Sequence, residues 1–569
     1  MFRINLTPRV AIILLAALVL TACQQIQPAP KAASVPLRAE VLVQGASLQG
    51  GANGIYFDNQ DRLYVGSVGG QRITVMDPET GQLLDKFGPE QGVAGADDLI
   101  NGPDGSLYWT SLMTGEVGRM TPDGVKSGQV VAPGVNPITF SDDGRLFVAL
   151  DFMGDTLYEL DPELAEPPRL IAENLGWLNA FDFGPDGFLY GPLIQKGMVA
   201  RIDVDSGSVT PVAGGFDFPV AVKFDPQGRL HLIEATSGKV WRIDTVTGNK
   251  EVVATIERGL DNLAFDSQGR LFVSRNDDGF IVEVLPNGTT RTVSSGGMIS
   301  AYGIAVLADE QGNESIFVAD VTALRQFDGQ TGSTQNVYHS LLFVTDPQAQ
   351  MTELQAPMTA AADGKQLVLS SWFVNAVQVW DSTTRKVVES YPDFAVPLNA
   401  IRFQGDLIVA ELETNRVVRA SGDNPAERTT LAADLAVPMG LAASDNNLWV
   451  SEWAKGTVLQ LIAGGELLAE PKVVATGLAA PEGMAIALDG SLLVVESGAG
   501  RLSRIDLNSG KVIPIVEGLE LGASGPPTMP PIWGFSGVAV GPSGTIYVTG
   551  DKADVVYHLV AASAAAKLD

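Results

Sequence analysis

Pairs of short hydrophobic segments, each pair divided by a polar turn, recur along almost the entire chain. In residues 260–275, "LDNLAFDSQGRLFVSR", the apolar runs "NLAF" and "RLFVS" lie on either side of such a turn. Apolar runs of this length, bounded by Asp-Gly, Gln-Gly or Asn-Gly turns, predict antiparallel β-strands and argue against helices.

This unit occurs twelve times. The hydrophobic residue that heads its second strand falls at Leu63, Leu107, Leu146, Leu189, Leu230, Leu271, Ile316, Leu367, Leu407, Leu448, Leu492 and Ile546. Third strands such as "RITVMD" and "KVWRID" follow, and shorter fourth strands such as "KEVVATI" complete the unit. Most steps are roughly 40–45 residues, which is the period of a four-stranded β-propeller blade.

Twelve blades exceed the usual four to eight of one ring, so the sequence predicts an all-β protein of two tandem six-bladed propellers. A single twelve-bladed ring is the alternative. The early strand "AEVLVQ" can close the first ring and "TTRTVS" (Thr289–Ser294) the second, which would leave no open sheet edges. The predicted domains are therefore residues 39–288 and 289–562, followed by a disordered tail at 563–569.

The N-terminus has the layout of a secretory signal. Two arginines precede the apolar run "AIILLAALVL", which is too short for a membrane-spanning helix, and "LTAC" follows it. Small residues before a cysteine resemble the bacterial lipobox, so residues 1–22 are predicted to be removed and Cys23 lipidated. Gln24 favours an outer-membrane lipoprotein of the cell envelope, tethered by residues 23–38; a plain signal peptide with an incidental cysteine is the alternative.

Composition excludes several classes of function. The formal net charge of −29 argues against binding of DNA or RNA, which needs a clustered basic surface. Cys23 is the only cysteine and there are three histidines, so zinc sites and disulfides are not expected. No G-x-S-x-G or phosphate-binding loop occurs, and the scattered histidines make a Ser-His-Asp triad improbable.

The blades resemble those of the six-bladed family that includes regucalcin, gluconolactonase and the paraoxonases, and more loosely NHL repeats. The segments "ADDL" at 96–99 and "LDN" at 260–262 are similar to paraoxonase ligand segments. The resemblance implies a divalent cation, calcium above all, at the ring axis, held by Glu, Asn and Asp side chains that begin the innermost strands.

Alignment of the blades on their second strands places one residue of each blade at the mouth of the ring. In the first propeller these residues are Asn53, Asp97, Asn136, Asn179, Val220 and Asp261. Convergent side-chain oxygens suit a hard cation with six to eight ligands, although Asn and Asp are also common at turns. The corresponding residues of the second propeller differ: they are Tyr302, Met358, Asn399, Met439, Glu482 and Ser536.

The resemblance carries over only in part. The family's acid matches Asp97, its first Asn matches Asn179 and its Asp matches Asp261, but its second Asn falls on Val220, which cannot bind a metal. Water or Asn136 would have to fill that position.

These residues suggest hydrolysis of a lactone or ester, with a cation polarising the carbonyl and Asp261 acting as ligand and general base. Two alternatives stay open. The rings could bind a small molecule, peptide or glycan without catalysis, or the protein could be a metal-dependent lyase similar to the streptogramin lyases.

The second strands of the second propeller end in acids, and three of these, Glu411, Glu452 and Glu496, are predicted to surround its mouth with Glu482 and Asn399. The alternative is structural, since an acid at this position often binds neighbouring backbone amides or an arginine. Two long insertions, residues 338–358 and "GASGPPTMPPIWGF", could form a lid or a partner surface.

Overall fold

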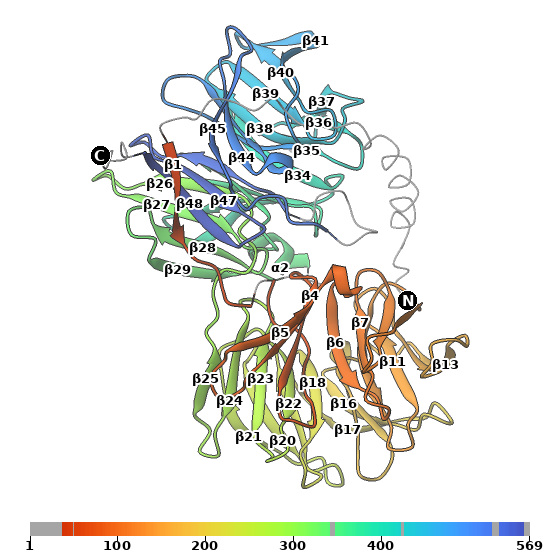
Figure 1. Ribbon diagram of the computed structural model, residues 1–569. Helices are drawn as coiled ribbons and strands as arrows, with labels where there is room; N and C mark the ends of the chain where they lie inside the picture. The colour runs from red at the N-terminus through yellow and green to blue at the C-terminus, as the bar shows by residue number, and fades with distance from the viewer. Residues whose placement is uncertain (1–36, 49, 342–346, 423–425, 526–533, 563–569) are drawn as a thin grey trace. The chain divides into compact units, whose positions relative to one another are not determined.

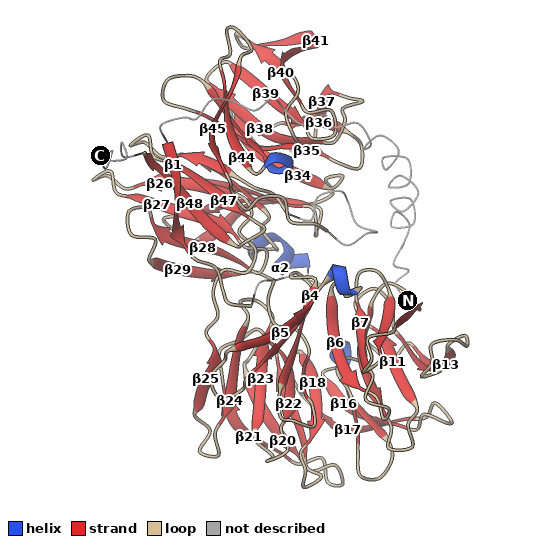
Figure 2. Cartoon of the chain, viewed as in Figure 1, coloured by secondary structure: helices blue, strands red, loops and turns tan. Residues whose placement is uncertain are grey.

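Almost all of the regular structure is β-strand (Figure 2). The computed structural model of the chain describes residues 37–48, 50–341, 347–422, 426–525 and 534–562. They contain twelve four-stranded antiparallel sheets, which divide into two compact units. One unit is Ala46–Ile299, and the other joins the residues up to Gly45 to those from Ser300 onward. Each unit holds six sheets, so the predicted pair of six-bladed propellers is confirmed.

The six blades of the first propeller are each built from four consecutive strands. They are β2 (Ile55–Phe57), β3 (Leu63–Ser67), β4 (Arg72–Met76), β5 (Leu83–Phe87); β6 (Ala96–Asn101), β7 (Leu107–Ser111), β8 (Glu116–Met120), β9 (Lys126–Val130); β10 (Val135–Phe140), β11 (Leu146–Leu150), β12 (Thr156–Leu160), β13 (Arg169–Glu173); β14 (Asp182–Phe183), β15 (Leu189–Leu193), β16 (Met198–Ile202), β17 (Val209–Gly214); β18 (Pro219–Phe224), β19 (Leu230–Glu234), β20 (Lys239–Ile243), β21 (Lys250–Thr255); β22 (Leu260–Phe265), β23 (Leu271–Arg275), β24 (Phe280–Val284), β25 (Thr290–Ser294). β2 packs against both β6 and β22, so the ring is closed.

The second propeller repeats this plan in its first five blades. Its strands are β26 (Ile304–Ala308), β27 (Glu314–Ala319), β28 (Ala323–Asp328), β29 (Thr334–His339); β30 (Thr359–Asp363), β31 (Gln366–Ser371), β32 (Ala376–Asp381), β33 (Lys386–Tyr391); β34 (Pro397–Phe403), β35 (Asp406–Glu411), β36 (Arg416–Ala420), β37 (Arg428–Ala432); β38 (Pro438–Ser444), β39 (Asn447–Glu452), β40 (Thr457–Ala463), β41 (Glu466–Ala475); β42 (Pro481–Ile486), β43 (Leu492–Glu496), β44 (Arg501–Ile505), β45 (Val512–Glu517); β46 (Val538–Val540), β47 (Ile546–Gly550), β48 (Val555–Ala561).

The sixth blade of the second propeller takes its outermost strand from the start of the chain. β1 (Leu37–Val43) pairs antiparallel with β48, and the sheet order is β1-β48-β47-β46 (Figure 1). β25 pairs with β24 of its own blade, through a turn that contains Gly288. The predicted closure was therefore wrong on both counts: β1 closes the second ring, and the first ring extends to Ile299 and not to residue 288.

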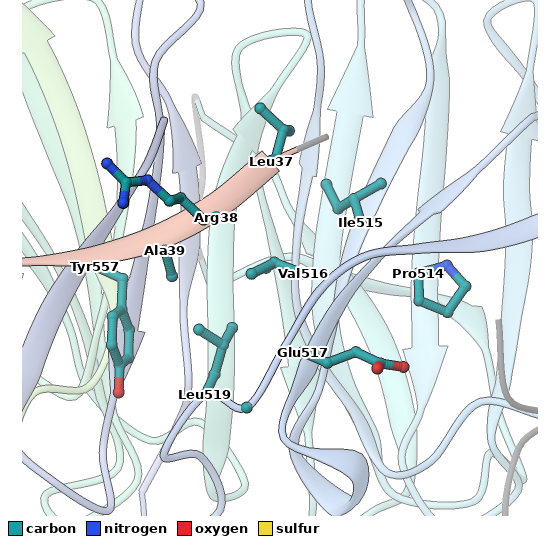
Figure 3. Close-up of a pocket in the computed structure, with 10 residues that line it drawn as sticks. Leu37, Arg38, Ala39, Pro514, Ile515, Val516, Glu517, Leu519 and Tyr557 are labelled. Carbon is teal, nitrogen blue, oxygen red and sulfur yellow. The ribbon is translucent and has the colours of Figure 1, made fainter. Parts of the chain in front are cut away.

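The closing strand leaves a groove beside the neighbouring blade. Figure 3 shows Leu37 and Ala39 of β1 across from Ile515 and Val516 of β45, with Tyr557 of β48 at one end. The groove has a volume of about 340 Å³. It lies between the outermost strands of two blades, far from the strands that begin at the axis.

The turns and the core explain why these residues form blades. In the hairpin of the sixth blade, Asp266 Oδ1 accepts hydrogen bonds from the amides of Gln268 (3.0 Å) and Arg270 (2.8 Å), and Gly269 has φ +77°. Such side-chain-to-backbone bonds and a left-handed glycine fix a tight turn. All twelve residues that head the second strands are at most 7% exposed. Each contributes about 1.5–3 kcal/mol by leaving water.

Helical structure is confined to short segments. α2 (Pro347–Thr352) lies in the insertion 338–358, and the 3₁₀ turns are Pro89–Gln91, Ile194–Lys196 and Ser497–Ala499. Part of the insertion packs on its own blade: Gln378 of β32 donates to the Glu353 carbonyl (2.9 Å), and Ser390 of β33 donates to that of Gln350 (2.9 Å). The predicted signal segment, Cys23, most of the Pro-rich insertion and the 563–569 tail lie outside the described residues. Within the described ranges, no helix is both long and apolar enough to span a membrane.

Candidate functional site

The mouth of the first propeller is built by breaks in the pairing of its innermost strands. In β6, β10 and β22, Ala96, Val135 and Leu260 pair with the ends of the second strands, and the register then shifts. A bulge of this kind turns the next side chain out of the ladder. The residues at that point are Asp97, Asn136 and Asp261, and the Leu178–Leu193 bridge puts Asn179 in the same place. These four residues therefore hold equivalent positions in the register of their blades.

A hydrogen-bonded network connects the third and fourth blades at this point. Asn136 Nδ2 donates to Asp151 Oδ2 (3.0 Å) and to Asn179 Oδ1 (3.3 Å). Asn179 Oδ1 also accepts the Ala180 amide (2.7 Å). Asn136 and Asn179 are both 7% exposed, so the network lies inside the ring and not in a solvated turn.

Asp261 is held from the neighbouring blade and from its own. Asn276 Nδ2 donates to Asp261 Oδ1 (3.2 Å), and the Asn53 side chain also hydrogen-bonds to Asp261. Asn53 Oδ1 itself accepts the amide of Val68 (3.1 Å). Asn53 therefore orients Asp261, while the Asn53 side-chain oxygen already accepts a hydrogen bond from the backbone.

Asp151 belongs to the site but is absent from the sequence-based prediction. It follows the second strand of the third blade directly and is fully buried. Its Oδ1 atom has no hydrogen-bond partner in the described structure. The signal was present as the acid at the end of "LFVALD", the position at which acids were noted only in the second propeller.

Burial, and then repulsion from nearby acids, raises the pKa of three carboxyls at this mouth. Burial, and then repulsion from Asp261 and Asp98, hold the pKa of Asp97 well above its usual range. Burial and repulsion from Asp97 do the same to the pKa of Asp151, and Asn136 partly opposes the shift. Burial, followed by repulsion from Asp98, raises the pKa of Asp261 to about 7. These shifts show that negative charge accumulates here without a matching positive charge.

The hydrogen bonds leave that charge uncompensated. Asp97 is 6% exposed, and its carboxyl accepts no hydrogen bond from any described residue. Asp151 Oδ1 lacks a donor too. Buried acids are normally hydrogen-bonded or paired, or they bind a metal. Among the described residues no three His, Cys, Asp or Glu side chains form a metal-binding group by themselves. A cation here would therefore need the amide oxygens of Asn136 and Asn179 as well as the acids.

The neighbouring acid Asp98 has a structural role. Its Oδ2 accepts the amide of Ile138 (3.2 Å), and its Oδ1 accepts Asn262 Nδ2 (3.3 Å) and the Leu99 amide (3.0 Å). Lys223 lowers the pKa of Asp98 against the rise that burial causes. In the pairs Asp97-Asp98 and Asp261-Asn262, the first residue thus belongs to the mouth, and the second forms hydrogen bonds between blades: Asp98 with the third blade, and Asn262 with Asp98 of the second.

One side of the mouth is apolar. Val220 is 4% exposed, at the place where the family pattern expects an Asn, and it packs in a cluster with Phe152, Trp177 and Phe218. These three aromatic residues adopt left-handed backbone conformations, with φ of 51°, 60° and 52°. Bulky residues rarely adopt them, and such strain concentrates at functional sites. The Phe152 and Trp177 rings lie 5.2 Å apart.

The histidine nearest to this ring is structural, as predicted. His231 is 6% exposed, its Nδ1 lies 3.2 Å from the Arg229 carbonyl oxygen, and its ring packs edge-on against Phe265. It is part of β19 and not of the mouth.

The strand-end acids of the second propeller, Glu411, Glu452 and Glu496, were predicted to surround a ligand site. In the structure they bind their own blades instead. Each acid accepts the backbone amide that precedes the innermost strand of its own blade: Ala395 to Glu411 (3.0 Å), Ala436 to Glu452 (2.9 Å) and Ala479 to Glu496 (2.8 Å). Their second oxygens bind Arg416, Thr457 and Arg501, and Lys455 also pairs with Glu452. The structural interpretation is therefore correct for all three, because every carboxylate is already satisfied.

Asn399 also does not occupy the predicted mouth position. Pro397 pairs with Glu411 as Pro438 pairs with Glu452, so the residue at the bulge is Leu398, and Asn399 returns to the ladder opposite Ala410. Asn399 stands eight residues before Leu407, whereas Met358 and Met439 stand nine residues before Leu367 and Leu448, so the alignment was one residue out in this blade. Glu482 does lie at its predicted position, 3% exposed, and Ser536 donates its amide to Glu482 Oε2 (2.7 Å).

Part of the chain matches a family model. Residues 98–297 match the model of the SMP-30/gluconolactonase/LRE-like region. No curated protein matches the chain.

Solved structures with similar folds include a virginiamycin B lyase from Staphylococcus aureus (16% identity, TM-score 0.36, 49% of this chain and 94% of that chain). A candidate gluconolactonase gives 15% identity and a TM-score of 0.35 over 47% of this chain and 95% of that one. The extracellular domain of a candidate one-component system from B. thetaiotaomicron gives 11% identity and a TM-score of 0.32 over 91% of this chain and 82% of that one. The segment that matches the family model, residues 98–297, includes β7 to β25 of the first propeller.

Proposed function

We propose that the first propeller is a divalent-cation-dependent hydrolase of a lactone or ester that carries an apolar group. The observation that supports this most directly is the axial set of buried acids from three blades, in which Asp97 and one oxygen of Asp151 have no donor. The match to the SMP-30/gluconolactonase/LRE-like region supports it independently.

The residues present fit a hard cation. Carboxylate and amide oxygens are the ligands that calcium prefers, and Asp97, Asp151, Asp261, Asn136 and Asn179 would supply them. When bound, the cation would supply Lewis-acid polarisation of the carbonyl oxygen. Calcium would also remove the mutual repulsion of the three acids.

Asp261 is the residue placed to move a proton. It is fixed by Asn53 and Asn276, so its carboxylate is oriented toward the mouth. Water adds to the carbonyl carbon, and its proton passes to Asp261. The carbon–oxygen bond of the ester then breaks, the proton passes to the departing alkoxide, and a carboxylic acid and an alcohol are released.

Val220 and the aromatic residues beside it determine which substrate fits. A largely apolar wall of Phe152, Trp177 and Phe218 offers sugar hydroxyls a single side-chain donor, the indole N–H of Trp177. We therefore expect an alkyl- or aryl-substituted lactone or ester to be preferred over a sugar lactone. Binding would come from the apolar surface that the substrate buries.

The test is a measurement of cation content and activity on the purified chain. Calcium binding by calorimetry and hydrolysis of γ-nonalactone, phenyl acetate and gluconolactone would be compared with and without chelator. The proposal expects chelator-sensitive hydrolysis of the first two, lost in Asp261→Ala and Asp97→Ala. A protein that binds calcium and hydrolyses none of them would indicate a non-enzymatic binding propeller. A protein that binds no calcium would refute the site itself.

The membrane anchor is a separate proposal. We infer that Cys23 is lipidated and that the chain is an envelope lipoprotein, on the strength of "LTAC" after the apolar run alone. Nothing in the hydrolase proposal depends on it.

A further inference from the structure

The mouth of the second propeller has one apolar side. Four of its six mouth positions are Tyr302, Met358, Leu398 and Met439, and they form a buried cluster with Phe535. Half-buried side chains pack against the cluster and form its rim: Val321, Trp372, Phe373, Val396, Leu412, Trp453 and Ala454. A mouth with this rim offers contact to an aromatic or alkyl group.

The opposite side of the same mouth is acidic. The remaining two positions are Glu482 and Ser536, and Ser536 Oγ donates to Asp551 Oδ1 (2.8 Å). The amides of Gly522 (2.7 Å) and Ala523 (3.0 Å) also donate to Asp551. Glu482 and Asp551 lie close enough for the charge of Asp551 to raise the pKa of Glu482.

No basic side chain neutralises this pair. Within the described ranges, neither Glu482 nor Asp551 forms an ion pair with Lys or Arg. The nearby acid Asp320 is already bound to Arg325. One apolar wall and one buried acid pair without a counter-ion therefore face the same axis.

The axial channel of the second propeller is lined by Asn399, which is 6% exposed. One polar group at this mouth lacks a partner: the Trp453 Nε1 donor forms no hydrogen bond in the described structure. Buried polar groups without partners are rare in folded proteins and are expected to be satisfied by water or a ligand. The channel has a volume of about 230 Å³ and also reaches Phe535 of the cluster.

We propose that the mouth of the second propeller binds an organic ammonium ion carried on an apolar or aromatic body. The ammonium group lies beside Glu482 and Asp551, and the body contacts Met358, Leu398, Met439 and the rim tryptophans. Aromatic faces attract a cation in addition to the apolar surface they bury. Mostly apolar walls with a few convergent polar groups are typical of small-molecule sites. This proposal does not depend on the hydrolase activity of the first propeller.

Tryptamine and 3-ethylindole form the matched probe pair, because they share the aromatic body and differ in the ammonium group. Binding is measured by calorimetry at pH 7 on the full chain with saturating calcium, so that cation-binding oxygens elsewhere are occupied. Tryptamine is expected to bind at least tenfold more tightly than 3-ethylindole. Equal affinity for both probes, or no binding of tryptamine, would overturn the proposal.

Substitutions then assign the binding to this mouth. Glu482→Gln keeps an oxygen for the Ser536 amide and removes the acid, and it is expected to weaken tryptamine binding at least tenfold. Trp372→Ala changes a half-buried rim residue, so the fold is preserved, and several-fold weaker binding is expected. Asp261→Asn in the first propeller is the matched control and leaves tryptamine affinity unchanged. Loss of tryptamine binding in Asp261→Asn but not in Glu482→Gln would place the amine in the first propeller and refute the assignment. Ester hydrolysis by Glu482→Gln stays at the wild-type rate, which separates this test from that of the hydrolase.

Discussion

Leu37 pairs with Ala561, so the first described strand of the chain completes the last blade of the second propeller. The first propeller is thus inserted in sequence between β1 and β26, and it needs no strand from outside its own range. This pairing removes one open edge from β48 and ties the start of the chain to its end.

Removal of β1 is expected to destabilise the second propeller alone. A variant that starts at Ala46 exposes the edge of β48 and the apolar side chains under Leu37 and Ala39, whereas all twenty-four strands of the first propeller are retained. Calorimetry should show two transitions in the full chain, one of which falls by several degrees or more in the variant. If both transitions kept their temperatures, β1 would not be the closing strand.

Replacement of Asp151 tests the cation site at the one residue that the sequence analysis did not predict. Asp151→Asn preserves the shape and the contact with Asn136, but it removes a carboxylate whose Oδ1 has no donor. We expect calcium affinity to fall at least tenfold by calorimetry, about 1.4 kcal/mol or more. Asp551→Asn, an acid of similar burial in the other ring, is the control and should not change the calcium affinity. An unchanged affinity in Asp151→Asn would exclude Asp151 from the site.

The sequence predicted the blades well because a blade is a local structure. Each hairpin depends on a turn such as Asp266–Gly269 and on a buried residue such as Leu271, and both are visible within about fifteen residues. The partner of β1 is not local. "AEVLVQ" and "TTRTVS" are equally good outer strands by sequence. Only the ring geometry decides that "TTRTVS" (β25) pairs with β24, the strand immediately before it.

The sequence predicted those site residues that occur once per blade at the same position. Asp97, Asn136, Asn179 and Asp261 follow from a constant spacing to the second strand. Asp151 was missed because it reaches the mouth from the end of a second strand. Asn399 was misplaced because the alignment put the mouth residue of this blade one residue too close to the second strand, and a single-residue slip changes the face on which a side chain lies.

Val220 offers a test of the departure from the family pattern. Val220→Asn places an amide where the family has a ligand, but within the cluster of Ala180, Ala221 and Ile233. In the calcium-free protein we expect a loss of about 1–3 kcal/mol in the free energy of unfolding, because the amide is buried without a partner. Calcium should restore part of it, so the rise in melting temperature upon calcium addition becomes larger than in the wild type. An equal rise in both proteins would show that this position does not face the cation.

Lipidation of Cys23 is tested in cells. The wild-type chain should incorporate labelled palmitate and fractionate with membranes, and Cys23→Ser should do neither. A chain that is secreted without label in both forms would instead carry a plain signal peptide.

The acid pair of the second propeller predicts a pH dependence of stability with a definite sign. Burial, and then repulsion from Asp551, raises the pKa of Glu482 from 4.5 to about 8 in the folded protein. A group whose pKa is raised on folding binds its proton more tightly in the folded state, so its stabilising contribution is complete below about pH 4.5 and is lost as the pH rises to about 8. The glutamine of the Glu482→Gln variant cannot ionise, so the variant does not lose stability in this way as the pH rises. The melting temperature of Glu482→Gln relative to the wild type should therefore rise by several degrees between pH 5 and pH 8.5, in the transition of the second propeller. A constant difference across this range would mean that Glu482 is ionised throughout, and the acid pair would then have to be neutralised by a cation already bound.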